Sequence, residues 1–340
     1  MKNMYQRQLS DIQCLIGNTP MLKIRYTYKG EERTIFAKAE YRNFTGSIKD
    51  RMAFFIFRDA IQSGTLRPGM KIAEATSGNT GISVVAIGRF LGHEVTIFMP
   101  DWMSIERINI MRSFGAVVRL VSKEEGGFLG SIAMSDAVKA NDPDNVFLPR
   151  QFDNDKNCKA HFFSTGPEIF SQMNAFNVIP DAFVAGVGTG GTVMGAGSFL
   201  RETYPHIKVH PLEPLSSPTL SVGHKVGKHR IQGISDEFIP SIVKIDQLDE
   251  IVGVDDGDAI VMAQRLAESF GLGVGISSGA NFLGAVALQN KFGKDYSVVT
   301  VFADDNKKYL STDYAKPEPV QQSFLSKDIT LVRMEAMPCY

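Results

Sequence analysis

A lysine in the first turn of a predicted helix is the residue of this chain best suited to covalent chemistry. Ser47 and Asp50 form a Ser-x-x-Asp capping box, which predicts a helix that begins at Ile48 and includes Lys49 in its first turn. The positive end of the helix dipole disfavours an ammonium ion there and helps to lower the lysine pKa. Lys49 is therefore either a solvated exception to the usual acidic first turn or an amine that reacts as a neutral nucleophile.

Two loops rich in glycine and hydroxyl side chains follow predicted strands and open predicted helices. The loop at 74–82 offers backbone N–H groups and the hydroxyls of Thr76, Ser77 and Thr80 to a carboxylate or phosphate. The alternative is that these hydroxyls only cap the helix that follows. The loop at 186–192 favours a bound phosphate, because its glycines let the backbone approach an anion closely. It also fits the G-x-G-x-x-G pattern of a dinucleotide site, with Glu213 further along the chain as the acidic partner.

A further loop at 275–281 precedes a predicted helix at 282–288, and Ser277 or Ser278 is most simply its cap. No one of these loops decides a function. Taken together, an activated lysine, a carboxylate seat, a phosphate seat and a further hydroxyl describe a pyridoxal phosphate site.

The elements that must position these loops follow an alternating pattern. Short β-branched runs alternate with stretches of helical period, which predicts a doubly wound α/β fold. The predicted strands cover 71–75, 94–99, 117–121, 146–148, 182–187, 208–213 and 297–302. A change of composition near residue 150 predicts a boundary between a first domain at 1–150 and a second at 151–314. Residues 315–340 are expected to form a tail that either docks or stays mobile.

Composition excludes several classes of function. The 340 residues include 36 basic and 37 acidic ones, so a net charge of −1 supplies no field for nucleic acid or anionic lipid. No stretch approaches the roughly 18 apolar residues of a membrane span, and the polar start lacks a signal peptide, so a cytoplasmic protein is expected. Three distant cysteines and six scattered histidines suggest neither disulfides nor a metal site.

Five segments in register carry a resemblance to a known family. Residues 16–21 (IGNTPM), 47–51 (SIKDR), 76–81 (TSGNTG), 188–192 (GTGGT) and 275–279 (GISSG) resemble the cysteine synthase (O-acetylserine sulfhydrylase) and cystathionine β-synthase family. The resemblance covers about residues 8 to 314 and outweighs the dinucleotide alternative. It implies the fold of type II pyridoxal-phosphate enzymes, the tryptophan synthase β-like class, in which two α/β domains hold pyridoxal 5'-phosphate between them, usually in a homodimer.

The resemblance also implies roles for individual residues. Lys49 would form the Schiff base and later move protons, Asn79 would bind the ring oxygen of the cofactor, and Ser277 would face its pyridine nitrogen. The cofactor phosphate would be held by Gly188, Thr189, Gly190, Gly191 and Thr192. The substrate carboxylate would be held by Thr76, Ser77, Thr80 and Gln151. A movable subdomain around 95–140 would close over the amino acid.

One segment departs from the family pattern. Where sulfhydrylases have small residues, positions 233–240 read GISDEFIP, with Asp236 and Glu237 carrying carboxylates. These side chains either face solvent or place Asp236 at the aminoacrylate intermediate, where it would repel hydrosulfide and act as general base for water. We therefore expect β-elimination from L-cysteine, which releases hydrogen sulfide, and addition of water to give L-serine, or decay of the aminoacrylate to pyruvate and ammonia.

Other functions remain open from the sequence alone. The main alternative is a cysteine synthase that makes L-cysteine from O-acetyl-L-serine and sulfide, and joining the aminoacrylate to another amino acid is a further one. A catalytically retired homologue with a regulatory role would have lost Lys49 or the 188–192 loop, and both are present.

Overall fold

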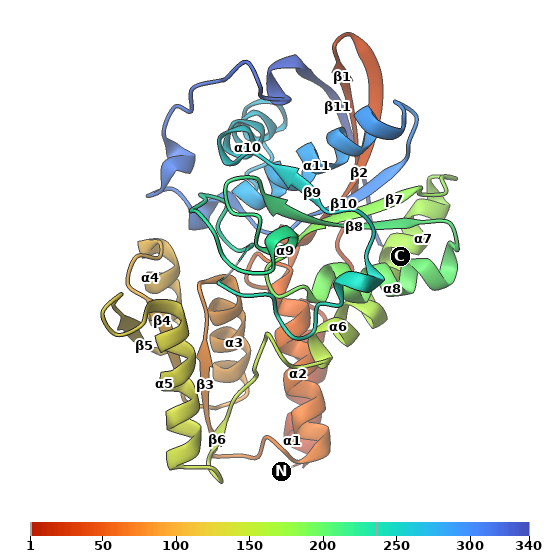
Figure 1. Ribbon diagram of the computed structural model, residues 1–340. Helices are drawn as coiled ribbons and strands as arrows, with labels where there is room; N and C mark the ends of the chain where they lie inside the picture. The colour runs from red at the N-terminus through yellow and green to blue at the C-terminus, as the bar shows by residue number, and fades with distance from the viewer. Residues whose placement is uncertain (1, 236, 340) are drawn as a thin grey trace.

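Two β-sheets organise the chain in the computed structural model, which describes residues 2–235 and 237–339 (Figure 1). The smaller sheet has four parallel strands in the order β5-β4-β3-β6, and the larger has seven in the order β11-β1-β2-β10-β7-β8-β9. Figure 1 shows the smaller sheet and its helices in the lower part of the view and the larger sheet above them.

The smaller sheet is built entirely from the first half of the chain. Its strands are β3 (Lys71–Ala75), β4 (Val95–Pro100), β5 (Val117–Val121) and β6 (Val146–Phe147). The helices that accompany it are α1 (Lys2–Gln13), α2 (Lys49–Ser63), α3 (Asn79–Phe90), α4 (Ile105–Ser113) and α5 (Gly127–Asn141). Buried side chains of α2, α3, β3 and β4, such as Phe57, Val84, Ile72 and Ile97, form one core, so this sheet and its helices fold around shared apolar contacts.

The larger sheet combines both ends of the chain. Strands β1 (Met21–Tyr28), β2 (Glu31–Ala39) and β11 (Ile329–Met337) pair antiparallel. Strand β2 then pairs in parallel with β10 (Val298–Phe302), and β7 (Ala182–Gly186), β8 (Lys208–Pro214) and β9 (Val252–Val254) complete the sheet.

Helices cover both faces of this sheet. Val184 of β7 packs in one core with α10 (Asp256–Phe270) and α11 (Ile276–Phe292). The adjacent Phe183 packs in another core with α7 (Gly166–Ala175) and α8 (Gly191–Thr203). Because successive residues of a strand point to opposite faces, the two helix pairs lie on opposite sides of the sheet. The shorter elements are α6 (Lys156–Ala160), the π-helix η2 (His161–Thr165), α9 (Thr219–Val222) and the 3-10 turns η1 (Glu40–Arg42), η3 (Ile245–Gln247), η4 (Asn306–Lys308), η5 (Asp313–Ala315) and η6 (Ser326–Asp328).

All the strands predicted from residue 71 onward are present, and four others were not predicted. These are β1, β2, β9 and β11. The alternation of β1 carried a usable signal, because Leu22, Ile24, Tyr26 and Tyr28 all enter the core beneath α10 and α11. The turn between β1 and β2 also has a hairpin pattern, since Lys29 and Gly30 both have positive φ, at 51° and 83°.

The capping box predicted at Lys49 is wrong in part. Helix α2 begins at Lys49 rather than Ile48, and Ser47 Oγ accepts a hydrogen bond from the Lys49 backbone N–H at 3.3 Å. The carboxylate of Asp50 instead binds the backbone N–H and hydroxyl of Thr45, at 2.7 and 2.6 Å. Asp50 thus fixes the loop before the helix, and Lys49 remains in the first turn.

The prediction of a loop over 275–281 is also wrong, because α11 begins at Ile276. Gly279 lies within the helix, where an added Cβ would meet the carbonyl oxygen of Ala259 at 2.2 Å. The glycine that indicated a loop therefore permits α11 to pack closely against α10.

The ends of the chain meet in the larger sheet. Strands β1 and β2, which precede residue 150, lie in the sheet with β7 to β10, and the segment after residue 314 docks through β11 on β1. The division of the chain at residue 150 stays a prediction. No helix among the described residues is long and apolar enough to cross a membrane.

A buried cluster of charged side chains ties α2 to β2 and α7. Arg51 Nε contacts Glu40 at 2.6 Å, and Arg51 Nη1 contacts Glu168 at 2.6 Å. Lys38 Nζ contacts the other oxygen of Glu168, also at 2.6 Å. The two cations and two anions balance, which burial of charge requires, and they hold the helix that carries Lys49 against the larger sheet.

Candidate active site

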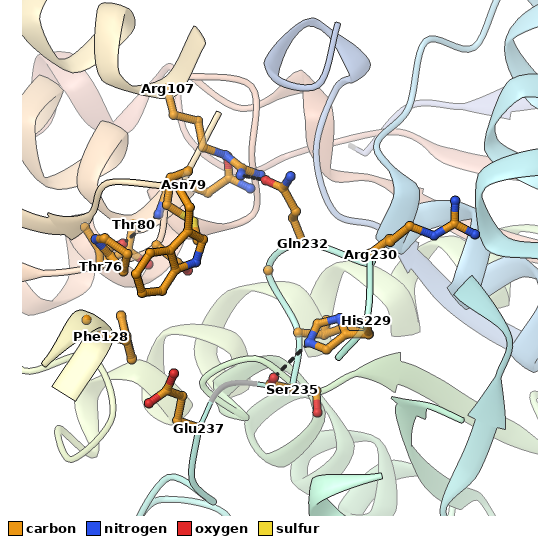
Figure 2. A pocket seen from close by; sticks show the side chains of 18 of the residues that line it. Thr76, Asn79, Thr80, Arg107, Phe128, His229, Arg230, Gln232, Ser235 and Glu237 are labelled. Carbon is orange, nitrogen blue, oxygen red and sulfur yellow. Dashed lines mark hydrogen bonds between the residues drawn. The ribbon is translucent and has the colours of Figure 1, made fainter. Parts of the chain in front are cut away.

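A cavity of about 770 Å³ brings together most of the predicted site residues (Figure 2). Its wall includes Lys49, Thr76, Ser77, Asn79, Thr80, Gln151 and Thr189. These residues come from the start of α2, the β3–α3 loop and the first turn of α3, the segment after β6 and the β7–α8 loop. The loops at the carboxyl ends of parallel strands thus converge on one space, as expected for an open α/β sheet.

Lys49 lies half-buried in the cavity wall at the first position of α2. Burial and the positive charges of Lys49 and Arg51 lower the pKa of His161 well below its usual value. His161 is therefore neutral. Its Nδ1 lies 2.9 Å from Thr165 Oγ1, and its Nε2 lies 3.4 Å from Thr192 Oγ1.

The loop predicted to bind a carboxylate is held from several sides. Thr80 Oγ1 donates to Gln151 Oε1 at 2.5 Å, and Gln151 Nε2 donates to the Ala75 carbonyl at 2.9 Å. The Thr76 hydroxyl accepts from the Gly78 N–H at 3.1 Å. Gln151, distant in sequence, is thereby fixed to the loop. The arrangement presents neutral donors at the N-terminus of α3, where the helix dipole favours an anion.

Asn79 is anchored from behind the cavity. Its Nδ2 donates to Asp304 Oδ2 at 2.7 Å, and the same carboxylate accepts from the Tyr309 hydroxyl. The Oδ1 atom of Asn79 is buried without a partner among the described residues. The second hydrogen of Nδ2 remains for an acceptor in the cavity, such as a ring oxygen.

The β7–α8 loop forms a close-fitting turn before a helix N-terminus. An added Cβ at Gly188 would lie 2.3 Å from the Gly233 carbonyl oxygen, and one at Gly191 would lie 1.9 Å from Asn157 Oδ1. Gly190 has φ +86°, a conformation that favours glycine. Thr189 Oγ1 accepts from Asn157 Nδ2 at 2.9 Å. The first amides of α8 have no partner within the helix, so the loop can bind an anion.

Ser277 lies in the first turn of α11 and is buried, directly after Ile276 of the cavity wall. The hydroxyl of the next residue, Ser278, is fully buried and has no partner among the described residues. The structure therefore places Ser277 next to the cavity, and its role stays a prediction.

The segment that departs from the family pattern borders the same cavity. Gln232, Gly233, Ser235 and Glu237 belong to its wall, whereas Asp236 lies outside the described residues. Ser235 has φ +53° and is held by four hydrogen bonds, one of them between its hydroxyl and that of Thr219 at 2.9 Å. Its N–H donates to Val187 O at 2.8 Å, its hydroxyl donates to Ser217 O at 2.8 Å, and its carbonyl contacts His229 Nε2 at 3.0 Å. Burial lowers the pKa of His229, which favours its neutral form.

Several residues of the cavity wall were not found from the sequence. Arg107, Gln232 and His229 have no spacing that marks them, because each comes from a segment that folding alone brings to the cavity. Trp102, Phe128 and Phe152 add apolar side chains to the cavity wall. The described residues contain no group of three or more His, Cys, Asp or Glu side chains that could hold a metal ion.

Comparison with known proteins agrees with this geometry. A family described as pyridoxal-phosphate dependent enzyme matches residues 12–304. A cysteine synthase from Staphylococcus aureus is 37% identical over 313 residues, which cover 91% of this chain and 98% of that protein.

Solved structures give a stronger likeness. A hydrogen sulfide-producing enzyme of Fusobacterium nucleatum is 58% identical, with a TM-score of 0.95 over 98% of this chain and 99% of that one. An aspartate-to-asparagine variant of that enzyme, solved with an α-aminoacrylate intermediate, is 57% identical at the same TM-score and the same coverage.

Proposed function

Because this chain belongs to the cysteine synthase family of pyridoxal-phosphate-dependent enzymes, we propose that it is an L-cysteine lyase that releases hydrogen sulfide. The proposed reaction converts L-cysteine and water into L-serine and hydrogen sulfide. The observation that carries this proposal is the 58% identity, over 98% of the chain, to a hydrogen sulfide-producing enzyme.

The residues of the cavity fit the cofactor of the family. The tightly packed Gly188–Thr192 turn at the start of α8 suits a phosphate group, and Lys49 and Asn79 face the same space. Asn79 has an amide hydrogen left for a ring oxygen, and the buried Ser277 lies beside the wall that Ile276 forms. When bound, pyridoxal phosphate acts as an electron sink that allows loss of a group from the β-carbon of an amino acid.

The proposal gives the protein groups distinct tasks. Lys49 holds the cofactor and moves the proton of the substrate α-carbon. Thr76, Ser77, Thr80 and Gln151 orient the amino acid through its α-carboxylate. Hydrogen bonds from Thr80 to Gln151 and from Gln151 to the Ala75 carbonyl already fix the loop in place.

The acidic segment at 236–237 favours water over hydrosulfide as the nucleophile. We propose that Asp236 is the general base that accepts a proton from water as the water adds to the β-carbon. A carboxylate there also repels hydrosulfide, which disfavours the reverse reaction. In support, the neighbours Ser235 and Glu237 both border the cavity, and hydrogen bonds fix Ser235 on three sides.

A second function is favoured by a different observation. The relative from Staphylococcus aureus is named cysteine synthase, and it is 37% identical over 91% of this chain. A cysteine synthase would use O-acetyl-L-serine and sulfide, and would use the same lysine and carboxylate loop. The two functions therefore differ in the leaving group and in the nucleophile.

The test measures products from purified holoenzyme. One reaction contains L-cysteine alone, and sulfide, serine, pyruvate and ammonia are quantified. Another contains O-acetyl-L-serine and sulfide, and L-cysteine is quantified. The variants are Asp236→Asn and, as a matched control, Glu237→Gln. The control removes the adjacent carboxylate, which pairs with Lys225 at 3.8 Å and has no proposed part in the chemistry.

We expect equal amounts of sulfide and serine from L-cysteine, lost in Asp236→Asn and retained in Glu237→Gln. Pyruvate and ammonia in place of serine would refute the addition of water. Rapid synthesis of L-cysteine, unchanged in Asp236→Asn, would establish the cysteine synthase instead.

The assembly and location implied by the sequence are also proposals. We infer a homodimer, which light scattering of the purified protein tests, since a monomeric mass would refute it. The expected cytoplasmic location is tested by cell fractionation.

A further inference from the structure

Arg107 is a buried cation in the cavity wall without a carboxylate partner among the described residues. The residue lies on α4 and is 2% exposed, and no acidic group among the described residues comes within 4.0 Å of it. Its Nη1 donates to Gln232 Oε1, and its guanidinium lies 4.6 Å from the centre of the Tyr309 ring. Its Nε has no hydrogen-bond partner in residues 2–235 and 237–339. Burial of a charge without an ion pair is costly, so this position needs a physical reason.

The guanidinium packs directly on the loop that we propose binds the substrate carboxylate. An added Cβ at Gly78 would lie 2.5 Å from both Cδ and Nε of Arg107. Figure 2 shows Arg107 above Asn79, with its guanidinium directed toward Gln232. The hydroxyl and amide groups of this loop are neutral, so Arg107 adds a full positive charge beside them.

Arg107 reaches this loop because α4 docks on the segment that follows β10. Ser104 Oγ donates to the Lys308 carbonyl at 2.9 Å. The carboxylate of Glu106 accepts from the N–H and hydroxyl of Ser311, at 2.6 and 2.7 Å. The position of the charge therefore depends on the docking of α4 on residues 308–311.

We propose that Arg107 is a positioning residue whose charge couples docking of α4 to binding of the substrate α-carboxylate. The inference rests on the proposed carboxylate loop. The substrate carboxylate supplies a negative charge for the Arg107 guanidinium. Because the guanidinium is buried, the attraction between the two groups is stronger than in water. By linkage, docking of α4 strengthens carboxylate binding by the same factor by which the carboxylate strengthens docking.

The test compares two ligands that differ in this charge. Holoenzyme is titrated with L-alanine, which has no leaving group, and with L-alaninamide, which lacks the carboxylate. Binding is followed by the visible absorption of the cofactor. Docking of α4 is followed by the fluorescence of Trp102, the single tryptophan of the chain, which lies in the cavity wall.

We expect Arg107→Gln to weaken binding of L-alanine by at least about tenfold, with little change for L-alaninamide. Arg107→Lys, which keeps the charge, should restore part of the preference for L-alanine. The control Arg112→Gln changes an exposed arginine on the same helix and should bind both ligands like the parent. L-alanine should change Trp102 fluorescence in the parent and not in Arg107→Gln.

A second variant tests the docking without touching Arg107. Glu106→Gln weakens the contact with Ser311 and should reduce affinity for L-alanine by about threefold, again with little change for L-alaninamide. This variant keeps the test valid if Arg107→Gln fails to fold.

Equal losses for both ligands, or no loss for either, would overturn the inference. Failure of the proposed function is distinguishable, because L-alanine binding does not require sulfide release. A holoenzyme that prefers L-alanine through Arg107 but forms no sulfide from L-cysteine would refute only the lyase proposal.

Discussion

Replacement of Glu168 by glutamine should destabilise the protein strongly, although the side chain keeps its size. The Glu168 carboxylate accepts from Arg51 Nη1 at 2.6 Å, Arg51 Nη2 at 2.7 Å and Lys38 Nζ at 2.6 Å. It also accepts from the backbone N–H groups of Asn18 and Thr19, at 2.9 and 3.3 Å. A glutamine has one acceptor oxygen, and its NH2 group would face a cation as a second donor.

The magnitude follows from burial. Lys38 and Arg51 have side chains that are 0% and 1% exposed, so water cannot replace the lost carboxylate. Loss of one partner from a buried ion pair costs about 3 to 5 kcal/mol. For a chain of 340 residues the entropy of unfolding is roughly 0.7 kcal/mol per kelvin, so the thermal midpoint should fall by about 4 to 7 °C.

The assay is a thermal unfolding scan of the holoenzyme at neutral pH. The control Glu250→Gln breaks the Lys291–Glu250 pair, whose side chains are 52% and 54% exposed, and should cost less than about 1 kcal/mol. Addition of Lys38→Met to Glu168→Gln removes the excess cation and should recover part of the loss. A Glu168→Gln midpoint equal to that of the control would refute this account of the buried cluster.

Two further predictions concern the cavity. Gly188→Ala should weaken retention of pyridoxal phosphate at least about tenfold, since its Cβ would lie 2.3 Å from the Gly233 carbonyl and overpacking would force the two loops apart. Equilibrium dialysis measures this affinity, and parent-like retention would contradict the packing argument. Burial raises the pKa of Glu74 to about 8, so between about pH 5 and pH 8 the folded protein keeps a proton that the unfolded chain releases. Stability due to this group is thus lost as pH rises, by about 1.4 kcal/mol per pH unit. The thermal midpoint of Glu74→Gln should rise relative to that of the parent as pH increases across this range, and the difference should stay constant above pH 8. A difference independent of pH would contradict the raised pKa of Glu74.

The sequence predicted the fold class, the family and the cofactor, and the comparisons confirm all three. Local pattern was sufficient for strands such as β3 and β10, because buried parallel strands are continuous apolar runs bounded by turn residues. It was insufficient at Asp50, whose carboxylate had two local uses, a capping box or the Thr45 loop. The geometry of the loop before the helix decided between them.

The β7–α8 loop shows what can be predicted about a site. Its glycines and threonines indicated an anion-binding loop, because glycine is the residue type that lets the backbone approach a bound anion closely. Gln151 could be identified only by family resemblance, since its hydrogen bond to Thr80 spans 71 positions of the chain.

The sequence by itself determined the chemistry available to this protein: a lysine at a helix start, hydroxyl-rich turns after strands, and two carboxylates at 236 and 237. Only the tertiary structure decided which distant groups act on that chemistry. Arg107 meets Gly78, Gln232 and Tyr309 because α4 docks on residues 308–311. Glu168 meets Arg51 because α6 and η2, which lead into α7, pack against α2. The strength of such contacts depends on burial and on the arrangement of several charges at once, and no local spacing in the sequence encodes these.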